Sequence, residues 1–208
     1  MSFWKFFSKQ AANPSGLFGK WIMPLVFDRG NAELNAMMKS RLDVRADEHV
    51  LEIGCGTGEL IRELAPLIGR GGVDGVEVSE AMASTARKRN QAAIDAGRVA
   101  IHLGDFNELD LGKEAYDTVC SCNTIYFWPD PAFTLKRVHS LLRPGGKVVI
   151  AFEDATRLEA KPISQEVFRF YSQEDVKRLL RDSGFPGEAE VDTRAGESAG
   201  LCCAVARS

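Results

Sequence analysis

The chain has 208 residues, a length that fits one domain with a terminal extension and buries a core without disulfide or metal staples. Its 45% hydrophobic and 26% charged residues are typical of a globular protein, and the net charge of -3 provides no basic surface for nucleic acid. The five cysteines and three histidines lack the spacing of zinc ligands, and no apolar run approaches the ~20 residues that cross a bilayer. We therefore expect a cytoplasmic protein with buried, reduced thiols, no metal and no nucleic-acid partner.

Residues 1–45 are predicted to form a helical extension ahead of a main domain at residues 46–208. Residues 1–27 hold seven of the eighteen aromatic side chains, which are Phe3, Trp4, Phe6, Phe7, Phe18, Trp21 and Phe27. Asn31 is predicted to begin a helix with one apolar side formed by Leu34, Met37, Met38, Arg41 and Leu42. Two compatible hypotheses follow for this segment: residues 17–38 cover a ligand as a lid, and the first ten residues make a weak peripheral membrane contact through their aromatic side chains, Lys5 and Lys9.

From Val50 onward, strand-like and helix-like patterns alternate. Short apolar runs predict strands at residues 50–53, 75–78, 99–103, 118–122 and 147–152. Helical spacing, capping residues and terminating glycines predict helices at residues 60–68, 80–97, 131–142 and 173–183. Residues 143–146, RPGG, predict a turn, and the runs at residues 189–193 and 201–206 predict a terminal hairpin.

This alternation predicts an α/β fold: a doubly wound, mostly parallel sheet of about seven strands with helices on both faces, an antiparallel C-terminal hairpin and the N-terminal helical extension. Ligands of such sheets bind beyond the carboxyl ends of the strands, where the strand order reverses. The residues directly after each strand are therefore the candidates for a functional site.

The loop after the first predicted strand, residues 52–58, has the sequence EIGCGTG. Its glycines allow a tight turn and a close approach of the backbone to a ligand. A dinucleotide site would have a third glycine where Glu59 stands, and a carboxylate there would face the pyrophosphate. The pattern therefore argues against a nicotinamide cofactor, and Glu52 suits a ligand with a positively charged amino group.

Residues 50–58, VLEIGCGTG, resemble the first motif of the class I S-adenosylmethionine-dependent methyltransferases, and the likeness continues to about Phe152. The resemblance implies a small methyltransferase that binds S-adenosylmethionine, with Glu77 at the ribose hydroxyls and Asp105 at the adenine amino group. It implies that residues 141–146, LLRPGG, have a structural role. The residues that it places at the cofactor are Glu52, Gly54, Cys55, Gly56, Gly58, Glu77, Val78, Met82, Asp105, Phe106 and Asn123.

The methyl acceptor is expected beyond the fourth strand, where Asn123 and Tyr126 are the candidate catalytic residues. No histidine follows a strand, and His102, within the third strand, is interpreted as packed. Because no base is evident, we expect a small-molecule acceptor such as an amine or a thiol. A membrane lipid headgroup and a noncatalytic cofactor-binding module are the alternatives, and the oligomeric state stays open. Three cations after the fifth strand face either an acidic acceptor or solvent: Arg157, Lys161 and Arg169.

Overall fold

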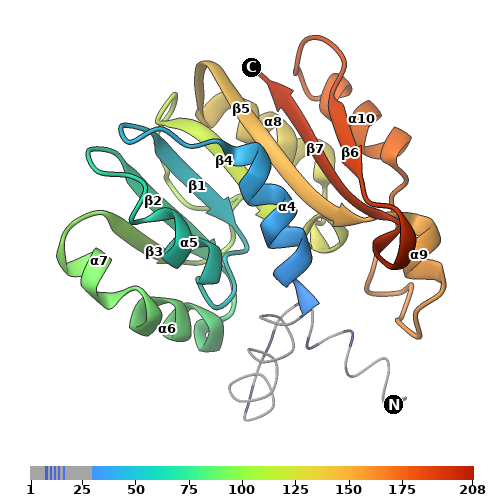
Figure 1. Cartoon of the computed structure of the whole chain (residues 1–208), viewed down its shortest axis with the longest axis horizontal. Helices are drawn as coiled ribbons and strands as arrows, with labels where there is room; N and C mark the ends of the chain where they lie inside the picture. The colour runs from blue at the N-terminus through green and yellow to red at the C-terminus, as the bar shows by residue number, and fades with distance from the viewer. Residues whose placement is uncertain (1–7, 9, 11, 13, 15, 17–29) are drawn as a thin grey trace.

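The computed structural model of the chain describes Ser8, Gln10, Ala12, Pro14, Gly16 and residues 30–208 (Figure 1). Seven strands form one sheet in the order β3-β2-β1-β4-β5-β7-β6. The strands are β1 (His49–Ile53), β2 (Gly72–Glu77), β3 (Val99–Leu103), β4 (Tyr116–Cys122), β5 (Leu142–Glu153), β6 (Glu190–Thr193) and β7 (Leu201–Arg207).

The first five strands are parallel, and β7 is antiparallel to both β5 and β6. In Figure 1 the arrows of β1 and β5 point the same way while β7 returns between β5 and β6. The predicted doubly wound sheet with a C-terminal hairpin is confirmed. The strand order reverses between β1 and β4, so the carboxyl ends of these two strands are where a ligand is expected.

Helices cover both faces of the sheet. The helices are α4 (Ala32–Leu42), α5 (Glu59–Leu64), α6 (Glu80–Arg89), α7 (Gln91–Asp95), α8 (Pro131–Leu141), α9 (Ala155–Glu159) and α10 (Gln173–Asp182), with two 3-10 turns, η1 (Ile125–Phe127) and η2 (Gly196–Ser198). The apolar side chains of α4, α5 and α6 belong to one buried cluster, and those of α8, α9 and α10 belong to another. The sheet therefore separates two hydrophobic cores.

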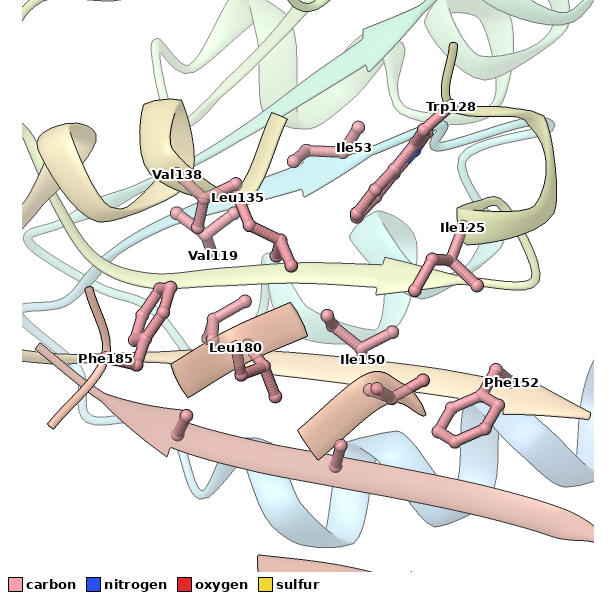
Figure 2. Packing of buried hydrophobic residues seen from close by; sticks show 14 of the residues in the cluster. Ile53, Val119, Ile125, Trp128, Leu135, Val138, Ile150, Phe152, Leu180 and Phe185 are labelled. Carbon is pink, nitrogen blue, oxygen red and sulfur yellow. The ribbon is translucent and has the colours of Figure 1, made fainter. Parts of the chain in front are cut away.

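The two cores follow from the alternation of side chains along each strand. In β5, Ile150 and Phe152 join the core under α8 and α10, whereas Val149 and Ala151 join the core under α4. Figure 2 shows the first of these cores, with side chains of α8 and of the α10 region packed over β4 and β5. The side chains labelled there are Ile53, Val119, Ile125, Trp128, Leu135, Val138, Ile150, Phe152, Leu180 and Phe185.

Two predicted helices are shorter than expected. The helix predicted over residues 80–97 is divided at Asn90, whose Nδ2 donates to Gly58 O at 3.0 Å and to Ala86 O at 2.9 Å. This side-chain bonding competes with the helical backbone and joins α6 to the glycine loop. α5 ends at Leu64, although Ile68, at the end of the predicted helix, is still buried.

The predicted turn at residues 143–146 lies inside β5, which was expected to begin only at Lys147. Leu142 already pairs with Tyr116, and after a register shift the ladder continues from the pair Thr118–Lys147. Arg143 Nη1 donates to Asp117 Oδ2 of β4 at 2.6 Å, which fixes this first part of β5. These contacts account for the structural role expected of the LLRPGG segment.

Helix α4 packs against β4, β5 and β7 and belongs to the core that it shares with α5 and α6 on one face of the sheet. Its buried side chains are Leu34, Met37, Met38 and Leu42, as predicted, whereas Arg41 is partly exposed and binds Glu190 and Asp192 of β6. The aromatic residues predicted to form a lid or a membrane contact, together with Lys5 and Lys9, lie outside the described residues, so both hypotheses stay predictions. Among the helices that the structure describes, none is long and apolar enough to cross a membrane.

Candidate functional site

A pocket of about 450 Å³ lies at the carboxyl ends of the strands, where the order reverses. Its lining comes from the glycine loop, from the residues after β2, β3, β4 and β5, and from the start of α4. All the residues predicted at the cofactor or in catalysis line it except Gly58. Lys161, one of the three cations predicted near an acceptor, also lines it, as do side chains for which the sequence predicted no place in the site, among them Asn31, Asn107, Glu153 and Phe168.

The glycine loop needs its glycines for two different reasons. Gly54 has a φ of 71°, and a Cβ there would clash with Thr124 Cγ2. Gly58 has a φ of 72°, and a Cβ there would lie 2.9 Å from Ala86 Cβ and 2.6 Å from Asn90 Nδ2. Gly54 therefore brings the loop against the end of β4, whereas Gly58 packs the loop against α6 without touching the pocket.

Two buried carboxylates at the carboxyl ends of β1 and β2, Glu52 and Glu77, line the pocket. Glu77 Oε2 accepts a hydrogen bond from Gly56 N at 2.9 Å, and Oε1 accepts one from Ser79 N at 2.8 Å. Glu52 is 3% exposed, and its Oε2 has no hydrogen-bond partner among the described residues. Burial, and then the charge of Glu77, raise the pKa of Glu52 well above its ordinary value. Burial also raises the pKa of Glu77, although its backbone hydrogen bonds oppose this shift.

A second unpartnered acceptor lies after β3. Asn107 Nδ2 donates to Thr134 Oγ1 at 3.1 Å, and this hydroxyl donates in turn to Asp130 O. Because the Thr134 hydrogen is already used, the amide must present its nitrogen to Thr134, and no residue that the structure describes donates to the buried Asn107 Oδ1. Asp105 Oδ1 accepts from Asn107 N at 2.8 Å and is exposed, and Phe106 is buried beside it.

Asn123 ends β4 in a left-handed conformation with a φ of 56°, which is uncommon for a residue with a side chain. Its Nδ2 donates to Asn31 Oδ1 at 2.7 Å, and its Oδ1 accepts from the Tyr126 hydroxyl at 3.0 Å. The same hydroxyl accepts a hydrogen bond from Glu153 N. Burial raises the pKa of Tyr126 well above its ordinary value, so this phenol stays neutral and acts as a hydrogen-bond donor.

Near the end of β5, the pocket is lined by both apolar rings and charged side chains. The ring centroids of Phe127 and Phe168 lie 4.7 Å apart, and the Phe168 and Tyr126 centroids lie 5.7 Å apart. Glu153, at the end of β5, forms ion pairs with Arg157 and Lys161. Arg169, the third cation predicted near an acceptor, donates instead to Pro129 O at 2.8 Å and does not line the pocket.

Three further sequence interpretations can be compared with the structure. Glu59 forms ion pairs with Arg62 and Arg89, so its charge is partly neutralised and opposes a pyrophosphate less than expected. His102 is partly exposed, with Nε2 3.7 Å from Asp74 Oδ2. The five cysteines are buried free thiols, and the residues that the structure describes include no group of His, Cys, Asp or Glu placed to bind a metal ion.

Comparisons with known proteins find methyltransferases. The profile of a family described as a methyltransferase domain matches residues 50–146. The O-methyltransferase cnsE of Penicillium expansum is 29% identical over 153 residues, which cover 70% of this chain and 54% of that protein. The chain thus spans about half the length of this relative.

Solved structures show the same fold. A chain of the complex between the Haloferax volcanii Trm112 methyltransferase activator and a methyltransferase superposes with a TM-score of 0.78 at 20% identity, covering 99% of both chains. Phosphoethanolamine N-methyltransferase 2 of Haemonchus contortus, in complex with S-adenosylmethionine, gives a TM-score of 0.67 at 26% identity over 77% of this chain and 38% of that one. The matched profile spans β1 to β4 and the glycine loop, and with these relatives it supports a class I S-adenosylmethionine-dependent methyltransferase.

Proposed function

We propose that this protein transfers the methyl group of S-adenosylmethionine to a small-molecule acceptor bound in the same pocket. The observation that carries the proposal is the unpartnered, buried Oε2 of Glu52. A buried carboxylate oxygen without a donor is costly, and the amino group of the methionine part of the cofactor would supply one. Glu77 is the last residue of the neighbouring strand β2 and lines the pocket. Its carboxylate suits the two ribose hydroxyls.

The adenine end of the proposed cofactor site has two acceptors for the adenine amino group. Asp105 is the residue that the sequence motif favours, but it already caps its own turn through Asn107 N. Asn107 Oδ1, buried and without a donor among the described residues, offers a second acceptor. Val78 and Phe106 line the pocket beside them and would enclose the ring.

The cofactor supplies an electrophilic methyl carbon on a sulfonium, so the work of the protein is to orient the acceptor and exclude water. Asn123 is held between Asn31 and Tyr126 at the end of β4, and its side chain lines the pocket. We assign Asn123 to contact with the reacting groups. Tyr126 is a positioning residue, because its hydroxyl is occupied by Asn123 and by the backbone of Glu153.

The likeness to phosphoethanolamine N-methyltransferase supports a phosphorylated amine headgroup, free or on a lipid, as the second candidate acceptor. The likeness to a chain solved with the Trm112 activator is a likeness of fold and carries no partner over to this protein. A noncatalytic cofactor-binding module is the least supported alternative, because the pocket extends well beyond the proposed cofactor residues to Lys161 and Phe168.

Calorimetry tests the cofactor, and a screen tests the transfer. Titration should show binding of S-adenosylmethionine and S-adenosylhomocysteine, with no heat from NAD. The purified protein is then incubated with labelled cofactor and pooled amines, thiols, phenols and phospholipids, and label in the product pools is measured. Binding of NAD without binding of either sulfur compound would refute the proposal.

A further inference from the structure

Glu153 is a carboxylate in the pocket that the sequence analysis did not consider. It ends β5, where the alternation of side chains places it on the same sheet face as Val149 and Ala151. Glu52, the residue before the last of β1, is on this face too, because it pairs in register with Cys120, which belongs to the same core. Both carboxylates therefore project from one face at the same edge of the sheet.

Cys122 lies between these two carboxylates. The charge of Glu52 and that of Glu153 both act on the Cys122 thiol, after burial, to raise its pKa. Cys122 also lines the pocket, beside Asn123. Because β4 lies between β1 and β5, Glu153 is on the other side of Cys122 from Glu52, the residue proposed to hold the amino group of the cofactor.

The two oxygens of Glu153 differ in their surroundings. Oε2 accepts from Arg157 Nε at 3.0 Å and from Lys161 Nζ. Arg157 is fixed in turn by the carbonyl oxygens of Glu197 and Ala199, at 3.1 and 2.9 Å. No described residue donates to Oε1. The two cations thus hold one oxygen and leave the other available in a side chain that lines the pocket.

The charges around Glu153 sum to one positive charge, since one carboxylate faces two cations. The neighbouring Asp154 does not line the pocket. Its carboxylate accepts instead from Thr156 N and Gln173 N, at the start of α9 and of α10. A positively charged amine would therefore meet a net repulsion here. The remaining walls are apolar and come from Phe127, Leu158, Ile163 and Phe168.

We propose that Glu153 Oε1 takes the proton of a phenolic hydroxyl whose apolar body lies against these walls. The inference rests on the proposed function and names its acceptor. As the phenol oxygen forms its bond to the methyl carbon, the O–H proton moves to Glu153, and the carbon–sulfur bond breaks with its electron pair going to sulfur. A phenolic hydroxyl is far more acidic than an aliphatic alcohol, so a carboxylate is a better-matched base for a phenol than for an alcohol.

Three matched probes test the acceptor class: 2-naphthol, 2-naphthalenemethanol and 2-naphthylmethylamine, each incubated with the full-length protein and S-adenosylmethionine. Formation of S-adenosylhomocysteine should be fastest with 2-naphthol. The carboxylate is tested with Glu153→Gln, which should lower the rate with 2-naphthol at least tenfold because the amide cannot take the proton. The rate with a nitrophenol, which is already ionised near neutral pH, should fall much less in this variant.

Two variants separate a base from a structural ion pair. Glu159→Gln changes an exposed carboxylate on α9, the helix that carries Arg157. Glu159 does not line the pocket, so this variant should leave the rates unchanged. Lys161→Met removes one cation but keeps the carboxylate that accepts the proton, so the rate with 2-naphthol should fall much less than in Glu153→Gln. Circular dichroism and the affinity for S-adenosylhomocysteine report whether each variant is folded.

The outcomes distinguish this inference from the proposed function. If neither S-adenosylmethionine nor S-adenosylhomocysteine binds, the proposed function fails and the inference fails with it. If the cofactor binds but 2-naphthol is not methylated, or the amine is the better acceptor, the inference alone is overturned. It is also overturned if Glu153→Gln is folded and methylates 2-naphthol at the original rate.

Discussion

Asn31 and Asn123 are 92 positions apart in the chain, yet their side chains share a hydrogen bond of 2.7 Å between Oδ1 and Nδ2. Asn31 precedes α4, and Asn123 ends β4 in a left-handed conformation. This bond, with that from the Tyr126 hydroxyl, holds a strained residue in one orientation at the wall of the pocket. Positioning of the acceptor should therefore depend on residues from two distant segments.

The first prediction concerns this group. Asn123→Ala and Tyr126→Phe should depress turnover more than affinity for S-adenosylmethionine, because orientation acts in the transition state. Tyr126→Phe also removes the hydroxyl that accepts from the buried Glu153 N. The loss of this partner should lower the free energy of unfolding by about 1–3 kcal/mol. Turnover with a labelled cofactor and calorimetric affinities should be measured for both variants. Unchanged turnover in both would move the acceptor site elsewhere.

The second prediction concerns Glu52. Its raised pKa means that, between pH 4.5 and that raised value, the folded protein holds a proton that the unfolded chain loses. Stability of the ligand-free protein should therefore fall as pH rises through this window, and binding of the cofactor ammonium should release the proton. Calorimetry in buffers of different ionisation enthalpy measures this release.

Glu52→Gln provides the comparison, because its side chain does not titrate. The variant should melt at a higher temperature than the original ligand-free protein at neutral pH, bind the cofactor more weakly and release no proton. Glu80→Gln, at an exposed carboxylate outside the pocket, is the matched control. Proton release that persists in Glu52→Gln would assign the titration to another group.

The third prediction concerns Glu77. Glu77→Ala removes the acceptor for the ribose and frees the N–H groups of Gly56 and Ser79. Each hydrogen bond to a charged acceptor contributes about 1.5–3 kcal/mol, so affinity for S-adenosylmethionine should fall at least tenfold. The fold should persist, as checked by circular dichroism. A folded variant with full affinity would mean that Glu77 does not bind the ribose.

The fourth prediction concerns the start of the chain. Ser79 Oγ donates to Pro14 O at 2.6 Å, and Ala12 and Pro14 line the pocket. Deleting residues 1–12 should leave cofactor affinity intact, because Pro14 is retained. Deleting residues 1–29 keeps α4 and its buried side chains but removes Pro14, so the cofactor should dissociate faster in stopped-flow measurements. Equal dissociation rates in the two truncations would argue against a lid.

Liposome co-sedimentation at low salt tests the second hypothesis for this segment, a weak membrane contact through the first ten residues. Two lysines contribute only ~1 kcal/mol each near an anionic surface, so any binding should disappear at high salt. The truncation lacking residues 1–12 is the matched control. Binding that is equal in the truncated and full-length proteins would refute the anchor.

The parallel sheet and the cofactor half of the pocket could be predicted because their signals are local. The glycine loop, Glu77 and Asp105 each directly follow a strand whose apolar run is visible in the sequence. In a parallel sheet, the ends of adjacent strands meet at one edge, so sequence order alone brought these residues together.

The proposed acceptor half could be predicted only in part: Asn123, Tyr126 and Lys161 were named from the sequence and line the pocket, but the rest depends on contacts between distant segments. Glu153 looks like an ordinary strand end until Arg157 and Lys161 are seen to share one of its oxygens. The proposed role of Asn31 in positioning the acceptor comes only from its hydrogen bond to Asn123. The division of the helix at Asn90 and the early start of β5 have the same cause, since side-chain bonds to other elements overrode the local pattern.

Helix α4 precedes every described strand in the sequence, but the strands that cover its apolar side include β7, which follows all the other described strands. During synthesis, Leu34, Met38 and Leu42 therefore cannot be fully buried until β7 has been made. Contacts of such long sequence separation slow folding and expose apolar surface in intermediates. Nascent chains that stop before Leu201 should accordingly be captured by chaperones or degraded, and resistance to a protease should be acquired only when β7 has left the ribosome.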